Sequence, residues 1–272
     1  MKKRLDGRTS KEVRKLQVLH DPFGYADGSV LLSLGATKVL ASVTLQTGVP
    51  FFLKGKGQGW LTAEYAMLPT ATKQRSMRES VNMQKNGRSV EISRLIGRSL
   101  RSVVACDVLG EKTVYIDCDV LQADGSTRVA SIIAASIALH RAQEKWIEKK
   151  KIKEPIIKDM LLAVSVGVTR ENNILVDLNQ IEDSQVIADF NFVLTVGKNI
   201  VEIQGTAEKR PLSPDQFDQM KDAALEAIGS INTALLDHAE VKGKKIREKN
   251  NFVKPAPRAT VFSLEKRFEK TL

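Results

Sequence analysis

The segment 124–128, Asp-Gly-Ser-Thr-Arg, has the composition of a phosphate-binding turn. It follows a strand-like alternation and precedes an apolar run typical of a buried helix. The N-terminus of such a helix offers free backbone N–H groups and the positive end of its dipole to an anion. Gly125 would let the backbone turn, and Arg128 would add a guanidinium fork for oxyanions. Ser126 and Thr127 would add hydroxyl donors. An ordinary capped turn fits the same pattern.

Further residues that could handle phosphate or metal stand elsewhere in the chain. Arg88 follows Asn86-Gly87 at an expected helix start and could be a second phosphate ligand. Asp183 and Asp189 belong to an acidic patch between expected strands. Paired carboxylates can hold Mg²⁺ or transfer protons, although turn and capping roles are commoner for such residues. The residues alone therefore predict a phosphate-handling protein, with RNA as one candidate ligand.

Charge points to a polyanionic partner. The 272 residues carry 42 Lys/Arg against 32 Asp/Glu, a formal net charge of +10. Residues 242–272 hold ten of the basic residues and three Glu, so this end alone carries +7. A second basic stretch, 73–101, has eight Lys/Arg against two Glu. Such stretches bind nucleic acid or are simply solvated, and composition does not separate the two.

Several classes of protein are not expected. Cys106 and Cys118 form no CxxC pair and suggest buried thiols in a reducing compartment. The three histidines are far apart in sequence, so zinc chemistry or catalysis centred on histidine is not expected. No apolar segment follows the charged N-terminus, and the most apolar run, 129–139, is too short to span a bilayer. We expect a cytoplasmic protein without a membrane partner.

The elements that would position these residues are mostly strands. Strand patterns cover 29–34, 38–45, 60–68, 113–121, 161–168, 174–178, 189–196 and 200–204. Helical patterns cover 89–105 and 129–139, and a third helix opens after Ser213 with a proline at its first position. From Lys242 the pattern dissolves into charge. The sequence predicts a mixed α+β fold with two strand-rich halves in residues 1–241, followed by a basic extension, 242–272.

Read together, short motifs along the chain resemble the bacterial ribonuclease PH family. The likeness runs from about residue 5 to residue 239. So many motifs in the same order as in the family are more specific than any single motif. The matching segments are DGR at 6–8, GVP at 48–50, GKGQGWLTAEY at 55–65, EI at 91–92, RLIGR at 94–98, IDCDV at 116–120, QADG at 122–125, EDS at 182–184 and EIQGTAE at 202–208.

The resemblance implies a fold, an assembly and a reaction. The fold is like domain 2 of ribosomal protein S5, and the assembly is a homo-hexameric ring, a trimer of dimers. The reaction is phosphate-dependent trimming of the 3′ ends of tRNA precursors and other RNA, with inorganic phosphate as co-substrate and nucleoside diphosphates as products. By resemblance, phosphate is bound by Arg88, Ser126, Thr127 and Arg128. Asp183 and Asp189 are catalytic and hold Mg²⁺, and RNA contacts Lys73, Arg75, Arg78 and Lys85.

The chain departs from the family pattern in places. Ser126 stands where the family usually has a second glycine, Thr70 stands where an arginine is common, and 242–272 is an addition. Two other functions are considered. A non-catalytic ring subunit of an exosome-like assembly would share the fold, and an RNA-binding protein without turnover would explain the charge. Neither explains why the chain keeps Arg88, Arg128 and Asp183 together, so we expect an enzyme.

Overall fold

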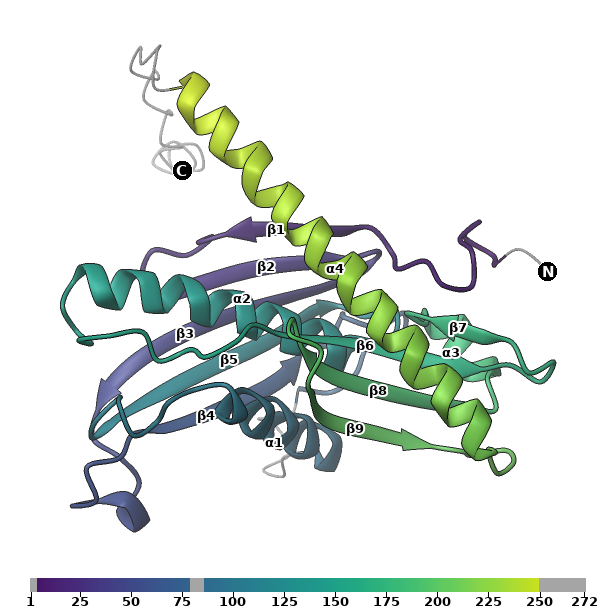
Figure 1. The fold of residues 1–272 in the computed structure, drawn as a ribbon, viewed down its shortest axis with the longest axis horizontal. Helices are drawn as coiled ribbons and strands as arrows, with labels where there is room; N and C mark the ends of the chain where they lie inside the picture. The colour runs from purple at the N-terminus through teal and green to yellow at the C-terminus, as the bar shows by residue number, and fades with distance from the viewer. Residues whose placement is uncertain (1–3, 79–85, 250–272) are drawn as a thin grey trace, which may run out of the picture. The chain divides into compact units, whose positions relative to one another are not determined.

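The computed structural model describes residues 4–78 and 86–249, whose strands form two sheets (Figure 1). The five-stranded sheet has the order β1-β2-β3-β5-β4, and the four-stranded sheet has the order β7-β6-β8-β9. This is the expected α+β fold with two strand-rich halves. The strands are β1 Leu16–His20, β2 Gly28–Leu34, β3 Thr37–Thr47, β4 Trp60–Met67, β5 Lys112–Gln122, β6 Leu161–Val168, β7 Ile174–Val176, β8 Ala188–Thr195 and β9 Ile200–Thr206.

Helices join and cover these sheets. The helices are α1 Gly87–Ser102, α2 Thr127–Glu148, α3 Gln180–Gln185 and α4 Pro214–Lys249, with a short 3-10 turn at Phe51–Leu53. Strands β4 and β5 run parallel because α1 forms the crossover between them, and α1 packs on β4. All other strand pairs in both sheets are antiparallel.

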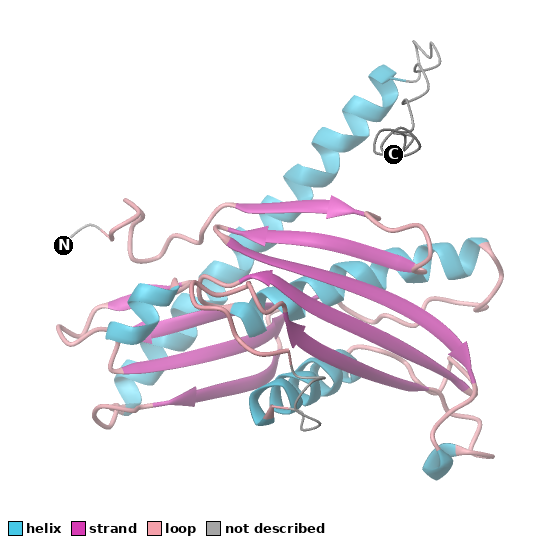
Figure 2. Cartoon of the chain, turned by 180° about the vertical axis from the view of Figure 1, so that it is seen from behind, coloured by secondary structure: helices cyan, strands magenta, loops and turns pink. Residues whose placement is uncertain are grey.

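Helix α2 belongs to the core of both sheets. It packs against β2, β3 and β5 of one sheet and against β6 of the other, and it is buried nearly all round. Gly28 permits this contact, because a Cβ there would lie 2.3 Å from the Ala138 carbonyl oxygen. From the back, the strands of the five-stranded sheet lie in front of this helix (Figure 2). The expected apolar helix at 129–139 is therefore confirmed, and it is longer than its apolar run.

The structure corrects four expectations. β1 and α3 were not predicted: β1 is a short edge strand, and α3 is one turn and a half in what we read as a patch between strands. The helix expected at 89–105 begins at Gly87 and ends at Ser102, so Val103 and Val104 are buried beyond its end. Helix α4 continues to Lys249 rather than dissolving at Lys242. Alanine, glutamate, lysine and arginine sustain a helix without an apolar stripe, and the next proline is Pro255.

The chain divides into two units, residues 1–236 and 237–272. The boundary that we expect between a catalytic domain, 1–241, and a basic extension stays a prediction. Within the described ranges no helix is long and apolar enough to cross a membrane. Both cysteines are free thiols, and Cys118 is buried as its place in the alternating strand predicts.

Candidate functional site

The turn between β5 and α2 is held in an unusual backbone conformation. Gly125 and Ser126 both have positive φ, +76° and 55°, and α2 begins at the next residue. Gly125 lies against the backbone that enters α3, since a Cβ there would lie 2.6 Å from the Asn179 carbonyl carbon. The N-terminus of α2 and the start of α3 are therefore neighbours, although they are 53 positions apart in sequence.

The hydroxyl groups of this turn are already bonded within the protein. Ser126 Oγ donates to the Leu178 carbonyl oxygen at 2.8 Å and lies 2.7 Å from Ser165 Oγ. The Tyr65 hydroxyl donates to Thr127 Oγ1 at 3.0 Å. Ser126 makes no side-chain cap to α2, so the first-turn N–H groups of that helix stay available to an anion. Backbone N–H groups, more than hydroxyls, would bind phosphate here.

The two candidate phosphate arginines come from different helices. Arg88 lies in the first turn of α1, and its backbone N–H is capped by the Asn86 side chain at 3.1 Å. Arg128 lies in the first turn of α2, and its Nη1 donates to Glu91 Oε1 at 3.1 Å and to Gln204 Oε1 at 3.0 Å. Both guanidiniums act on the pKa of Tyr65, so they approach the same buried phenol. The structure thus brings together two arginines that are 40 residues apart in sequence.

The acidic candidates lie near these arginines. Asp183 is on α3 and Asp189 is near the start of β8. Burial raises the pKa of Asp183, while the positive charge of Arg88 and then of Arg128 lowers it in part. Burial also raises the pKa of Asp189, and the nearby charges of Asp183 and Glu208 raise it further. A carboxylate pair that shares one partly buried place is poised to take a cation or a proton.

A cavity of about 310 Å³ lies beside these groups. Its lining is polar and comes from α1, the start of α2, β8, β9 and the segment after β9. The lining residues are Glu91, Arg128, Asp189, Asn191, Gln204, Gly205, Thr206 and Glu208. One candidate phosphate ligand and one candidate catalytic acid therefore face the same space, and Arg88 and Asp183 lie within electrostatic reach of it.

Sequence reasoning missed part of this lining. Glu91, Gln204 and Glu208 all lie within motifs that carry the family resemblance, yet we assigned them no role. Their signal was their place in the EI and EIQGTAE motifs, at 91–92 and 202–208. What sequence could not show is that α1 and β9 meet at Arg128.

The candidate RNA-binding residues are only partly described. Lys73, Arg75 and Arg78 are exposed in the loop after β4, and Ser76 fastens this loop by donating its N–H to the Pro69 carbonyl oxygen at 2.9 Å. Lys85 lies outside the described residues. An exposed basic loop fits an RNA contact and fits a solvated surface equally well.

A metal site needs oxygen ligands of the right number. Residues 4–78 and 86–249 hold no group of three or more His, Cys, Asp or Glu that could ligate a metal. Asp183 and Asp189 nevertheless fit Mg²⁺, because that ion commonly takes one or two carboxylates and completes its shell with water and substrate phosphate. Burial is the main cause of their raised pKa values, and nearby carboxylates raise them further.

Comparison with known proteins covers most of the chain. Residues 12–144 match domain 1 of the 3′ exoribonuclease family, and residues 159–227 match domain 2. "Ribonuclease PH" of Geobacillus sp. is 48% identical over 228 residues, which are 84% of this chain and 89% of that protein. "Ribonuclease PH" of Bacillus cytotoxicus is 47% identical over 225 residues, 83% of this chain and 92% of that protein.

Solved structures show the same fold at lower identity. A chain of the Archaeoglobus fulgidus exosome, solved with RNA bound to the active site, has a TM-score of 0.74 at 22% identity and covers 86% of this chain and 93% of its own. Rice Rrp46 has a TM-score of 0.69 at 20% identity, with 85% and 97% covered. At this identity the likeness concerns the fold alone.

Proposed function

Because the chain belongs to the 3′ exoribonuclease family and is a phosphate-dependent exoribonuclease of the ribonuclease PH type, we propose that its phosphate site is built from Arg88, Arg128 and the turn at Ser126-Thr127. Phosphate bound there attacks the phosphorus of the last diester linkage in RNA. The bond from that phosphorus to the 3′ oxygen of the preceding nucleotide breaks. A nucleoside diphosphate leaves, and the freed 3′ oxygen takes a proton.

The observation that carries this proposal is the convergence of Arg88 and Arg128 on one place beside the N-terminus of α2. A dianionic nucleophile must approach an anionic diester, so the site has to offset the charge of both. Two guanidiniums and a helix N-terminus supply positive charge in a fixed arrangement, which lowers the cost of bringing the anions together.

We assign the chemical step to Asp183 and Asp189. Both carboxyls have raised pKa values and lie within electrostatic reach of Arg128. A carboxylic acid with a raised pKa is a better proton donor for the leaving 3′ oxygen than an ordinary one. Mg²⁺ held by this pair would, when bound, offset negative charge that builds up in the transition state.

The substrate that we propose is the 3′ end of tRNA precursors and of other RNA. The exposed Lys73, Arg75 and Arg78, with Lys85, would contact the RNA backbone upstream of the cleaved bond. The relatives are named for a ribonuclease, and one structural neighbour was solved with RNA in its active site. The two free cysteines support our expectation of a reducing, cytoplasmic setting.

We propose a homo-hexameric ring as the working form. Two solved structures that share the fold are an archaeal exosome and an archaeal exosome core. A groove on one subunit binds few nucleotides, so a ring would lengthen the RNA path across subunit boundaries. Light scattering that shows a fully active monomer at assay concentration would refute this assembly.

The rival role, a non-catalytic ring subunit of an exosome-like assembly, has less support. Relatives at 46–48% identity are named ribonuclease PH, whereas the exosome structures lie at 22–24%. Incubation with RNA, phosphate and Mg²⁺ decides between the two. We expect stepwise 3′ shortening and nucleoside diphosphates as products. Monophosphates released without phosphate in the buffer would overturn the phosphorolytic mechanism, and no turnover at all would favour the rival.

A further inference from the structure

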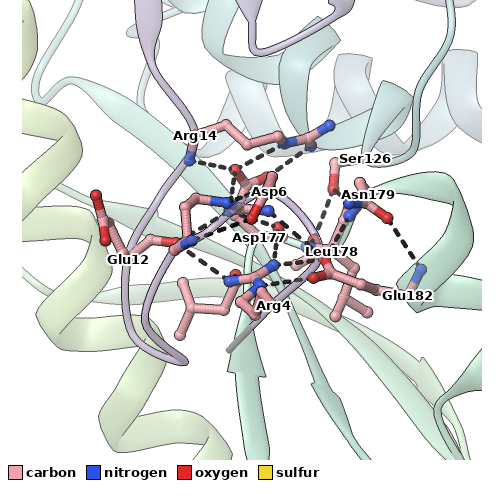
Figure 3. Close-up of polar contacts among 12 residues, drawn as sticks. Arg4, Asp6, Glu12, Arg14, Ser126, Asp177, Leu178, Asn179 and Glu182 are labelled. Atoms are coloured by element: carbon pink, nitrogen blue, oxygen red, sulfur yellow. Dashed lines mark hydrogen bonds and ion pairs between the residues drawn. The ribbon is translucent and has the colours of Figure 1, made fainter. Parts of the chain in front are cut away.

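Three arginines of the N-terminal segment, residues 4–14, are buried behind the candidate site. Arg4, Arg8 and Arg14 are each 9% exposed or less. Each pairs with the fully buried Asp177 or with Glu182. Figure 3 shows Arg4 and Arg14 beside these two carboxylates. We call these five residues the arginine cluster. Buried charges persist only when they are paired and hydrogen-bonded, so this segment is fixed in place by its ionic contacts.

Arg14 connects the phosphate turn to the segment that enters α3. Its Nε and Nη2 donate to the two carboxylate oxygens of Asp177 at 2.9 and 2.7 Å. Its backbone N–H also donates to Asp177 Oδ2 at 2.7 Å, and its Nη1 donates to the Asp124 carbonyl oxygen at 2.5 Å. Asp124 immediately precedes Gly125 of the phosphate turn, and Asp177 belongs to the segment that leads into α3. The Arg14 side chain is therefore bonded to both segments.

Arg4 fixes α3 in the same way. Its Nε and Nη2 donate to both Glu182 oxygens at 2.6 and 2.5 Å, a bidentate pair. Its Nη1 also donates to the Val176 carbonyl oxygen at 2.7 Å. Glu182 in turn accepts the Asn179 N–H at 3.0 Å and completes the capping box of α3. Glu182 immediately precedes Asp183 in a helix of six residues, so Arg4 is bonded to the residue next to the candidate acid.

We propose that Arg14 and Arg4 are positioning residues of the phosphorolytic site. Arg14 sets the place of the phosphate turn, and Arg4 sets the orientation of the acidic helix. This inference rests on the proposed function. Neither arginine contacts substrate, and each acts through groups that do. Catalytic groups must be held to within about 0.5 Å, and a shift of about 1 Å can cost roughly 100-fold in rate.

The test compares Arg14→Lys and Arg4→Lys in the full chain, because lysine keeps the charge but loses the fork. Arg14→Lys should raise the KM for phosphate by roughly 10-fold or more, and Arg4→Lys should mainly lower kcat by a similar factor. RNA affinity should stay unchanged in both. The matched control is Lys11→Met in the same segment, whose exposed ammonium pairs with Glu226 at 2.9 Å and should have wild-type kinetics.

A second pair of variants tests whether the position of the phosphate turn affects phosphate use, even if the arginine variants do not fold. Thr37 Oγ1 accepts the Asp124 N–H at 2.9 Å and donates to the Gly125 carbonyl oxygen at 2.8 Å. Thr37→Val keeps the shape without the hydroxyl, and it should raise the phosphate KM. Thr37→Ser keeps the hydroxyl and should remain near wild type.

Lowered melting temperatures with wild-type kcat and phosphate KM would overturn the inference, because the arginine cluster would then serve stability alone. Arg128→Ala and Asp183→Asn are measured alongside. If those two keep full activity, the proposed site itself is wrong. If they lose activity while the Arg4, Arg14 and Thr37 variants keep it, only the positioning role is overturned.

Discussion

The Ser126 hydroxyl donates a hydrogen bond of 2.8 Å to the Leu178 carbonyl oxygen, and this bond fastens the phosphate turn to the segment leading into α3. Ser126 has φ 55°, in the left-handed region that favours glycine. The family's usual glycine at this position would avoid that strain. Ser126 adopts this strained backbone conformation, and the hydrogen bonds of its hydroxyl to Leu178 and Ser165 offset the energetic cost.

The Ser126 variants should therefore separate strain from hydrogen bonding. Ser126→Ala loses both hydroxyl bonds and keeps the strain, whereas Ser126→Gly loses the bonds and the strain. We expect the alanine variant to be less stable than the glycine variant by about 1 kcal/mol. Urea unfolding measures this difference. Equal stabilities would show that the left-handed backbone costs nothing here.

Replacing Arg128 by alanine should mainly impair the use of phosphate. The change removes a charge-assisted contact of about 2–4 kcal/mol, which corresponds to roughly a 30- to 1,000-fold loss in kcat/KM for phosphate. RNA affinity should survive. Arg141→Ala is the matched control, since Arg141 lies on the same helix but pairs with Asp21 at 3.0 Å, away from the cavity. A normal phosphate KM for Arg128→Ala would remove this residue from the site.

Asp183→Asn should slow the chemical step while phosphate and RNA still bind. Asparagine keeps the size of the side chain but can neither ionise nor supply a proton. We expect kcat to fall by roughly 30- to 1,000-fold, with a much smaller change in either KM. Single-turnover assays at saturating RNA and phosphate measure the step directly. Full activity of this variant would show that the acidic site is assigned wrongly.

The same substitution should stabilise the fold at neutral pH. Burial raises the pKa of Asp183 in the folded state, so the folded protein binds this proton more tightly than the unfolded chain does. The ionised carboxyl therefore costs stability above its raised pKa, and the cost disappears as pH falls below the ordinary value. Asp183→Asn should raise Tm by about 1–3 °C at pH 7 and by less near pH 4. A lower Tm at pH 7 would contradict the direction of the shift.

How far the sequence predicted this molecule depends on how local each signal is. The strand at 161–168 is confirmed to the residue, because its run of mostly apolar and uncharged residues matches a strand buried on both faces. The alternation at Val114, Ile116 and Cys118 likewise matches a strand with one buried face. The short elements β1 and α3 were not predicted, because their apolar patterns are weak and tertiary contacts define them. Arg4 and Glu182 stabilise α3 from 178 residues apart.

The candidate site likewise combines residues that a local sequence pattern predicts with residues that only tertiary packing brings there. Arg128 was recognisable because a turn, a helix start and an arginine are adjacent in sequence. Glu91 and Gln204 could not be placed beside it, because their approach depends on the packing of α1 and β9. The pairing of the buried arginines near the N-terminus was not predicted, since composition does not distinguish a solvated charge from a paired one.

The last prediction concerns the basic end of the chain, which divides into two parts of similar charge. Helix α4 reaches Lys249, so residues 242–249 extend a helix and carry five basic residues and one Glu, a net of +4. Residues 250–272 lie outside the described residues and carry five basic residues and two Glu, a net of +3. This end is an addition to the stretch that matches the family, which stops at residue 227. We therefore expect it to strengthen RNA binding rather than to take part in catalysis.

Two truncations, after Val241 and after Lys249, test this role. Each phosphate contact on a single strand adds about 0.7 to the slope of log affinity against log salt. Truncation after Lys249 should flatten the slope in part, and truncation after Val241 should flatten it further, with little change in turnover at saturating RNA. The alternative is that Phe252, Val261, Phe262, Leu264 and Phe268, all outside the described residues, dock on a neighbouring subunit. Truncation would then reduce the oligomer mass or Tm while the salt slope hardly moved. An intact oligomer with an unchanged slope in both truncations would contradict an RNA-binding role, because charge that contacts RNA must release counterions when it binds.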